Sequence, residues 1–114
     1  MSDYKINPHT AGAKLDKNKP DMDLVLGRFP RALEAVSAVG TFGANKYSED
    51  GWLQVPNGIR RYGSAMLRHY FKDSEGEYLD AETQLPHVAA VAWNALSRLE
   101  LILLEKELEN GVPR

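Results

Sequence analysis

Residues 85–104 read LPHVAAVAWNALSRLELILL, a long stretch that is apolar on more than one face of a helix. It predicts a helix from about Thr83 to Asn110, with Thr83 as cap, Pro86 in the first turn and Gly111 as the stop. Such a helix would span roughly 40 Å. A helix of this kind in so short a chain favours packing between subunits. We therefore expect a homo-oligomer, a dimer or tetramer, built through this helix.

Two shorter helices are predicted before it. Proline is favoured at the first helical position, so the first helix should run from Pro30 to about Gly40. Thr41–Tyr47 either continues it or forms a short helix of its own. Ser48–Gly58 has turn chemistry, and an apolar stripe predicts a second helix over about Asn57–Lys72. No strand pattern stands out, so the expected fold class is all-α, a small helical bundle.

The first part of the chain differs from the rest. Residues 1–28 are rich in charge, carry Pro8 and Pro20, and lack helical periodicity. They are predicted to form an extended N-terminal arm, which the apolar patch Met22–Leu26 anchors to the body. Residues 29–114 are then the helical domain, a single globular unit.

Composition narrows the classes of function. The 114 residues include no cysteine, which excludes a disulfide scaffold, a thiolate zinc site and a cysteine nucleophile. The net charge of −2 disfavours direct DNA binding through a basic surface. The longest unbroken apolar run, Val88–Trp93, is far shorter than the roughly 20 residues of a membrane span. With no signal peptide at the N-terminus, a cytoplasmic protein without a membrane partner is expected.

A polar stripe runs along the long helix. His87, Asn94 and Arg98 share one side of it, at offsets of 7 and 11 residues. Buried polar groups need partners. The stripe is either a satisfied core histidine with hydrogen-bonded neighbours, or the wall of a site. In the second case His87 is a metal ligand or general base and Arg98 faces phosphate.

Several acids could complete a metal site. Glu34 lies among apolar residues of the first helix, and the connection Asp73–Glu82 is acidic. Within it, Glu77 and Asp80 are three residues apart, the spacing of a metal pair if that segment is helical. Asp80 and Glu82 precede His87 closely enough to share a site with it. Carboxylates suit Mg²⁺, a hard ion that prefers oxygen. The alternatives are a surface charge for Glu34 and a solvated acidic loop for the connection.

Basic and aromatic residues could hold a nucleotide. Cations on the arm and the second helix could bind phosphates, and aromatics in the glycine-containing loop could stack on a base. Plain surface or core roles are the alternatives, and for His69 the alternative is a core or interface histidine. The candidates of this kind are Lys14, Lys19, Lys46, Tyr47, Trp52, Arg61, Arg68, His69, Asn94 and Arg98. No Walker loop and no G-x-S-x-G motif is present.

Several strings together resemble one family. They are Gly12–Asp21, Pro30–Val36, Gly40–Tyr47 with Trp52, Arg61–Tyr62, Leu67–His69, and Leu85–His87 with Asn94. The chain resembles the phage dATP/dGTP diphosphohydrolase N-terminal domain family over about residues 11 to 104. That family is similar to the MazG-like all-α nucleoside triphosphate pyrophosphohydrolases, which hold Mg²⁺ with helix carboxylates and release a monophosphate and pyrophosphate. If the protein is phage-encoded, its cytoplasm is that of the host.

The resemblance implies roles for particular residues. Glu34 and His87 would be catalytic, and Glu34, Asp80, Glu82 and His87 would hold Mg²⁺ or Mn²⁺. Ions of this kind lower the pKa of a bound water, and a carboxylate or His87 would accept its proton. The sequence departs from the MazG-like pattern, in which the first helix has two glutamates three residues apart. Here Ser37 and Arg31 flank Glu34 at that spacing, so the metal site is either rebuilt or weakened.

Three functions remain open at this point. The first is Mg²⁺-dependent hydrolysis of purine deoxynucleoside triphosphates. The second is a non-catalytic module that binds a nucleotide and sequesters a signalling nucleotide of host immunity. The third is an accessory protein of DNA metabolism.

Overall fold

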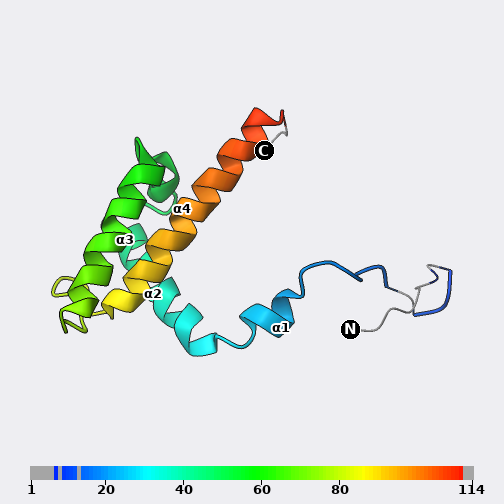
Figure 1. Ribbon diagram of the computed structural model, residues 1–114, viewed down its shortest axis with the longest axis horizontal. Coiled ribbons are helices and arrows are strands. Elements are labelled where there is room, and N and C mark those ends of the chain that lie inside the picture. The colour runs from blue at the N-terminus through cyan, green and yellow to red at the C-terminus, as the bar shows by residue number, and fades with distance from the viewer. Residues whose placement is uncertain (1–6, 8, 13, 112–114) are drawn as a thin grey trace.

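The computed structural model describes residues 7, 9–12 and 14–111, and these form helices joined by turns (Figure 1). The all-α prediction is confirmed, since the described residues contain helices and a single isolated β-bridge. The elements, in chain order, are α1 Met22–Leu26, α2 Pro30–Lys46, the 3₁₀ helix η1 Gly51–Gln54, α3 Gly58–Ser74 and α4 His87–Glu109.

An antiparallel pair, α3 and α4, makes up the body of the protein, and α2 packs across α4 (Figure 1). The N-terminus of α3 lies against the C-terminal half of α4, because the backbone at Gly58 approaches the side chain of Leu101. At the other end, His69 of α3 contacts His87 of α4. This arrangement brings the last turns of α3 and the first turns of α4 together around the connection between them.

The long helix begins later than the sequence predicts. Thr83 is not its cap, and Pro86 stands before the helix as its N-cap residue instead of inside its first turn. The reason is a tight turn in the preceding loop. Gln84 adopts a left-handed φ of 59°, and Leu79 and Pro86 form an antiparallel bridge. Gly111 follows the helix with a φ of 71°, as predicted for a C-terminal stop.

The other helix boundaries agree closely with those predicted from the sequence. Helix α2 starts at Pro30 and continues through Thr41–Lys46, which settles the open choice in favour of one helix. The helix continues through Gly40, where the absence of a side chain lets α2 pack closely against Trp93 of α4. A Cβ at this position would lie 2.7 Å from the ring of Trp93. Helix α3 begins one residue after Asn57 and ends two residues beyond Lys72.

The arm is less regular than the body. Residues 1–6, 8 and 13 lie outside the described residues, so the prediction for them stays open. The patch Met22–Leu26 forms α1, a short helix capped by the Asp21 side chain. Its large apolar side chains are 44% to 65% exposed, and α1 stands apart from α2, α3 and α4 (Figure 1). The predicted anchoring of the arm to the body was therefore wrong for the single chain.

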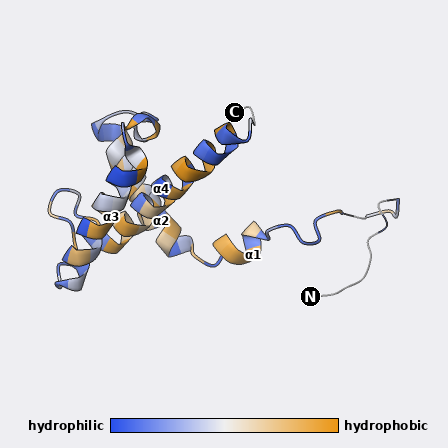
Figure 2. Ribbon diagram, turned by 45° about the horizontal axis from the view of Figure 1, so that its top comes forward, coloured by the Kyte–Doolittle hydropathy of each residue, from blue (hydrophilic) through white to orange (hydrophobic). Residues whose placement is uncertain are grey.

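Few side chains are fully buried, and many large apolar ones are exposed. The accessible surface is 9087 Å², whereas a compact monomer of 12.7 kDa exposes roughly 6,200 Å². Figure 2 shows hydrophobic colouring on α1 and along much of α4. By length and composition α4 is apolar enough to cross a membrane, a test that core helices of soluble proteins also pass.

Candidate metal centre and adjoining cleft

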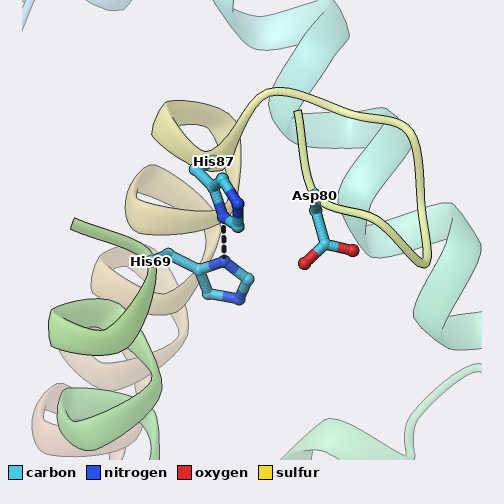
Figure 3. Close-up of side chains that lie close together, drawn as sticks. All are labelled: His69, Asp80 and His87. Atoms are coloured by element: carbon cyan, nitrogen blue, oxygen red, sulfur yellow. Dashed lines mark hydrogen bonds between the residues drawn. The ribbon is translucent and has the colours of Figure 1, made fainter. Parts of the chain in front are cut away.

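Two histidines meet where α3 and α4 come together. The Nδ1 atoms of His69 and His87 are 2.8 Å apart, within hydrogen-bonding distance. Figure 3 shows their rings side by side, with the carboxylate of Asp80 facing them from the loop. One ligand atom from each of the three residues can be chosen so that all lie within 4.8 Å of one another. We call this group the His–Asp–His cluster.

The loop holds Asp80 firmly. Its Oδ1 accepts hydrogen bonds from the backbone amides of Glu82 and Thr83, both at 2.9 Å. Its own amide donates to the carbonyl of Leu85, and its carbonyl accepts from the amide of Gln84, both at 2.8 Å. The same turn that delays the start of α4 therefore fixes this carboxylate in front of the two imidazoles.

His87 is held from both sides. Its side chain is 3% exposed, and its Nε2 lies 2.6 Å from Oε2 of Glu77, which is 48% exposed. Its other ring nitrogen contacts His69. Because both nitrogens are already engaged, the ring is fixed in orientation. As a ligand or as a general base, His87 would have to give up one contact; a ligand would release His69 from Nδ1 and keep Glu77 on Nε2.

The electrostatics favour a neutral imidazole beside an ionised carboxylate. Burial lowers the pKa of His69, and the neighbouring His87 and Arg68 lower it further, against an opposing effect of Asp80. Burial alone would raise the pKa of Asp80, but the backbone amides of Thr83 and Glu82 outweigh this and lower it. These are the protonation states in which such side chains bind metal ions.

The donor set fits a divalent cation. Imidazole nitrogens suit zinc, copper, iron and nickel, and carboxylate oxygens suit magnesium, calcium and manganese. A histidine ligand commonly donates its other N–H to a carboxylate, as His87 can to Glu77. The three residues could therefore hold one ion, and Glu77 would orient the buried histidine.

Beside the cluster lies a wide cleft of about 1020 Å³ between α2, η1, α3 and α4. Two tryptophans build its floor, with Trp52 and Trp93 in an edge-to-face contact at 5.9 Å between ring centroids. The hydroxyl of Tyr62 donates to the carbonyl of Trp52 at 2.8 Å and ties η1 to α3. The missing side chain of Gly40 leaves room for the Trp93 ring.

The cleft is cationic. Its charged lining residues are Arg60, Arg61, Arg68 and Glu49, so arginines outnumber acids three to one. Arg68 precedes His69 of the cluster in α3. On α4, cleft-lining Asn94 is seven residues from His87, about 10 Å along the axis. The cleft and the cluster thus share the same two helices, and a ligand that spans about 10 Å along α4 could reach both.

The structure groups many of the residues singled out from the sequence. Asp80 and His87 belong to the cluster, together with His69, which was predicted as a nucleotide contact. Five of the predicted nucleotide contacts line the cleft: Tyr47, Trp52, Arg61, Arg68 and Asn94.

Other predicted residues lie elsewhere. Glu34 is exposed on α2, roughly 160° around the helix from the buried Val36. Glu82 and Lys46, predicted as metal ligand and phosphate contact, instead pair with each other at 2.6 Å. The remaining predicted phosphate contacts are exposed and outside the cleft: Lys14, Lys19 and Arg98.

Three residues of the site were not predicted in their present place. His69 was not predicted as a ligand, Glu77 was predicted as a metal ligand paired with Asp80 on a helix, and Arg60 was not assigned a role. The signal for Glu77 was its spacing of three residues from Asp80. Nothing in the sequence indicated that His69 and His87 meet, because this depends on how the connection between α3 and α4 turns.

A family model described as dATP/dGTP diphosphohydrolase, N-terminal, matches residues 9–110. The chain belongs to this family. The matched range includes all the residues of the cluster and of the cleft. The family's description indicates hydrolase chemistry in nucleotide metabolism, and such chemistry suggests a divalent metal. No curated protein and no solved structure was found to match the chain.

Proposed function

We propose that this domain hydrolyses purine deoxynucleoside triphosphates to the monophosphate and pyrophosphate with a divalent cation, Mg²⁺ or Mn²⁺. The observation that carries the proposal is the shared location of the cationic aromatic cleft and the His–Asp–His cluster on α3 and α4. A triphosphate needs both a cationic binding surface and a metal site. The family match supports the substrate class.

The cleft would bind the nucleotide. The aromatic rings of Trp52 and Tyr47 offer flat apolar surfaces for the purine. The guanidinium groups of Arg61 and Arg68 would bind the phosphates with paired hydrogen bonds. Both arginines now bond within the chain, to the carbonyl of Pro56 and the hydroxyl of Ser64 at 3.2 Å, so they are already oriented along the cleft.

The cluster would hold the cation. His69, Asp80 and His87 are its proposed ligands, and a divalent ion there would supply charge for the phosphates and lower the pKa of a water. Glu77 orients His87, and its exposed carboxylate is available to accept a proton. Glu34 stays a predicted metal carboxylate and catalytic residue from the family resemblance, although it faces away from Val36 in the single chain.

The test is a pyrophosphate-release assay with each deoxynucleoside triphosphate and with Mg²⁺ or Mn²⁺. We expect release from the purine substrates, and loss of release in Asp80→Asn and in Arg68→Ala. Arg28→Ala is a matched control, because it removes an exposed arginine that lies outside the cleft. Absence of release from every substrate, with either metal, would contradict the proposal.

The cleft also supports a second candidate function, that of a non-catalytic module that sequesters a signalling nucleotide in a phage-infected cell. The observation that favours it is the pairing of Glu82 with Lys46, which occupies a carboxylate predicted for the metal site. A nucleotide that raises the melting temperature without being hydrolysed would select this function. Either function is proposed to operate in the cytoplasm.

We also propose that the active form is a homo-oligomer assembled through α4. Four large apolar side chains on this helix are each 51% or 52% exposed: Val88, Leu96, Leu99 and Leu103. They lie within about 80° of arc on one face. This exposed apolar face supports a partner on α4, and a second copy of α4 offers the same apolar face in return.

A further inference from the structure

We propose that the resident ion of the His–Asp–His cluster is a first-row transition metal such as Zn²⁺ or Mn²⁺, and that the cluster discriminates against Mg²⁺. The proposal rests on His69 and His87, which bring two imidazole nitrogens to the same point. It rests on the proposed function for the role of this site and narrows its metal, because of the two choices Mg²⁺ and Mn²⁺ only Mn²⁺ would then be held by the cluster. Its test needs no nucleotide.

The spacing of the two nitrogens matches that of two ligands on one ion. Zn–N bonds are about 2.0–2.1 Å long, which places two tetrahedral ligands roughly 3.3 Å apart. The Nδ1 atoms of His69 and His87 are 2.8 Å apart. The two nitrogens would have to separate by about half an ångström, and the rings would have to turn so that both lone pairs meet at one point. Asp80 lies close enough to approach the same point, since the three ligand atoms are within 4.8 Å of one another.

The hydrogen bonds also set which atoms can bind. Glu77 lies 2.6 Å from Nε2 of His87, and this contact favours the tautomer that has its proton on Nε2. The lone pair of His87 is then on Nδ1, facing His69. In the metal-free pair His69 donates its Nδ1–H to that lone pair. An ion there would need the Nδ1 lone pair of both rings, so the proton of His69 would move to its own Nε2, and both rings would stay neutral.

The choice of metal follows from the ligand types. Mg²⁺ prefers an octahedron of oxygens and gives up its water molecules reluctantly. The cluster offers it one carboxylate and two nitrogens, on a buried side where His87 is 3% exposed. Zn²⁺, Co²⁺ and Mn²⁺ accept imidazole and carboxylate together, and their affinities should increase from Mn²⁺ through Co²⁺, with Zn²⁺ also above Mn²⁺.

The experiment is a metal titration of the untagged protein after chelation, followed by calorimetry and by the visible absorption of Co²⁺. We expect one Zn²⁺ or Co²⁺ per chain, weaker Mn²⁺ binding, and affinity for Mg²⁺ at least about 100-fold lower than for Zn²⁺. His69→Ala and His87→Ala should each lose the Co²⁺ spectrum. The matched control is His9→Ala, since His9 is the one other histidine of the chain and lies in the arm.

A measurement on the unchanged protein covers the case in which a variant fails to fold. Nitrogen-15 spectra should show Zn²⁺ shifting the Nδ1 resonances of two histidines and leaving those of the third. Equal affinity for Mg²⁺ and Zn²⁺ would overturn the inference, as would Zn²⁺ binding that leaves both histidine resonances unchanged.

Glu77 provides a finer test as a positioning residue. We expect Glu77→Gln to weaken Zn²⁺ binding about 10-fold and Glu77→Ala about 100-fold, with one site per chain retained. Glutamine can still accept the hydrogen bond from Nε2, whereas alanine cannot. Equal affinities for the two variants and the unchanged protein would remove Glu77 from the site.

The two proposals can fail separately. Zn²⁺ binding without pyrophosphate release would leave this inference standing and reject hydrolysis. Pyrophosphate release supported by Mg²⁺, without any Zn²⁺ or Co²⁺ binding at the cluster, would support hydrolysis and reject this inference.

Discussion

Helix α4 has two faces that reverse the usual pattern of a small protein. The face toward its own chain buries polar side chains, with His87, Asn94 and Ser97 all at or below 7% exposure. The opposite face, about 180° away, exposes the leucines and valine of the proposed interface. An isolated monomer would be more stable with apolar side chains on the inner face and polar side chains on the outer face. The difference between the two faces is the basis for our proposals that the inner face carries a site and the outer face meets a partner.

The inner face is stable because each polar group has a partner. The Asn94 amide donates to the carbonyl of Ala90 at 2.8 Å, and the Ser97 hydroxyl donates to that of Trp93 at 2.9 Å. Among the described residues no buried side-chain polar atom lacks a hydrogen bond. The cost of burying these groups is thereby limited. Only His87 depends on partners outside α4, and these are the residues of the cluster and Glu77.

The largest expected effect comes from breaking the inner face at the cluster. Loss of a residue that only hydrogen-bonds a ligand, as Glu77 does, weakens metal binding roughly 10- to 100-fold. Asp80→Asn should weaken Zn²⁺ binding by more than this, because it neutralises the one anionic ligand of the cluster. Calorimetry measures the affinity. Asp73→Asn is the control, since this acid lies in the same region outside the cluster. Unchanged Zn²⁺ affinity in Asp80→Asn would remove the carboxylate from the site.

Breaking the outer face should dissociate the protein. The double change Leu99→Lys and Leu103→Lys places two charges in the proposed interface, and we expect a shift to monomer in sedimentation velocity. The matched control is Glu105→Lys, which also adds a lysine to α4 but lies off the apolar stripe. A monomeric unchanged protein at high concentration would contradict the proposed assembly.

A third change tests the packing that joins α2 to α4. Gly40→Ala would place a Cβ 2.7 Å from the ring of Trp93. Overpacking of this kind costs about 1–3 kcal/mol, so the urea midpoint should fall. Gly43→Ala is the control, because nothing lies within 4 Å of a Cβ there. Equal midpoints for the two variants would show that Trp93 moves freely.

A smaller effect separates stability from function on the inner face. In Asn94→Leu the internal hydrogen bond is replaced by an apolar group of similar size, so the free energy of unfolding should change by less than about 1 kcal/mol. Nucleotide binding should weaken, because Asn94 lines the cleft. Urea unfolding and nucleotide-dependent melting measure the two quantities. A large loss of stability would instead give Asn94 a structural role.

The smallest effect is expected at Glu34. Since it is exposed and lies about 160° around α2 from Val36, Glu34→Gln should change Zn²⁺ affinity less than about twofold. Its effect on pyrophosphate release tests the prediction taken from the family resemblance. Loss of pyrophosphate release with Zn²⁺ binding intact would support a catalytic role for Glu34. Unchanged pyrophosphate release would remove Glu34 from the site.

Much of the fold could be predicted from local signals. Proline at position 30 marks the start of α2, and the period of apolar residues gives α3 and α4. The start of α4 was misplaced because Asp80 caps a turn that Gln84 closes with a left-handed backbone. That turn depends on hydrogen bonds between loop residues, which periodicity does not report. The same turn decides where Asp80 lies.

The site was predictable only in part, for a related reason. A stripe of polar residues on an apolar helix indicated that His87 and Asn94 face something specific. Which residues they face depends on the register of α3 against α4, and this brought in His69. The pairing of Glu82 with Lys46 likewise joins segments 36 residues apart. Long-range contacts of this kind leave no periodic trace in the sequence.

The most direct test of the central claim is anomalous diffraction from crystals grown with Mn²⁺ and a non-hydrolysable purine deoxynucleoside triphosphate. The account predicts a manganese peak bounded by His69, Asp80 and His87, with the nucleotide in the adjoining cleft. A manganese peak at Glu34, with none between the two histidines, would contradict it.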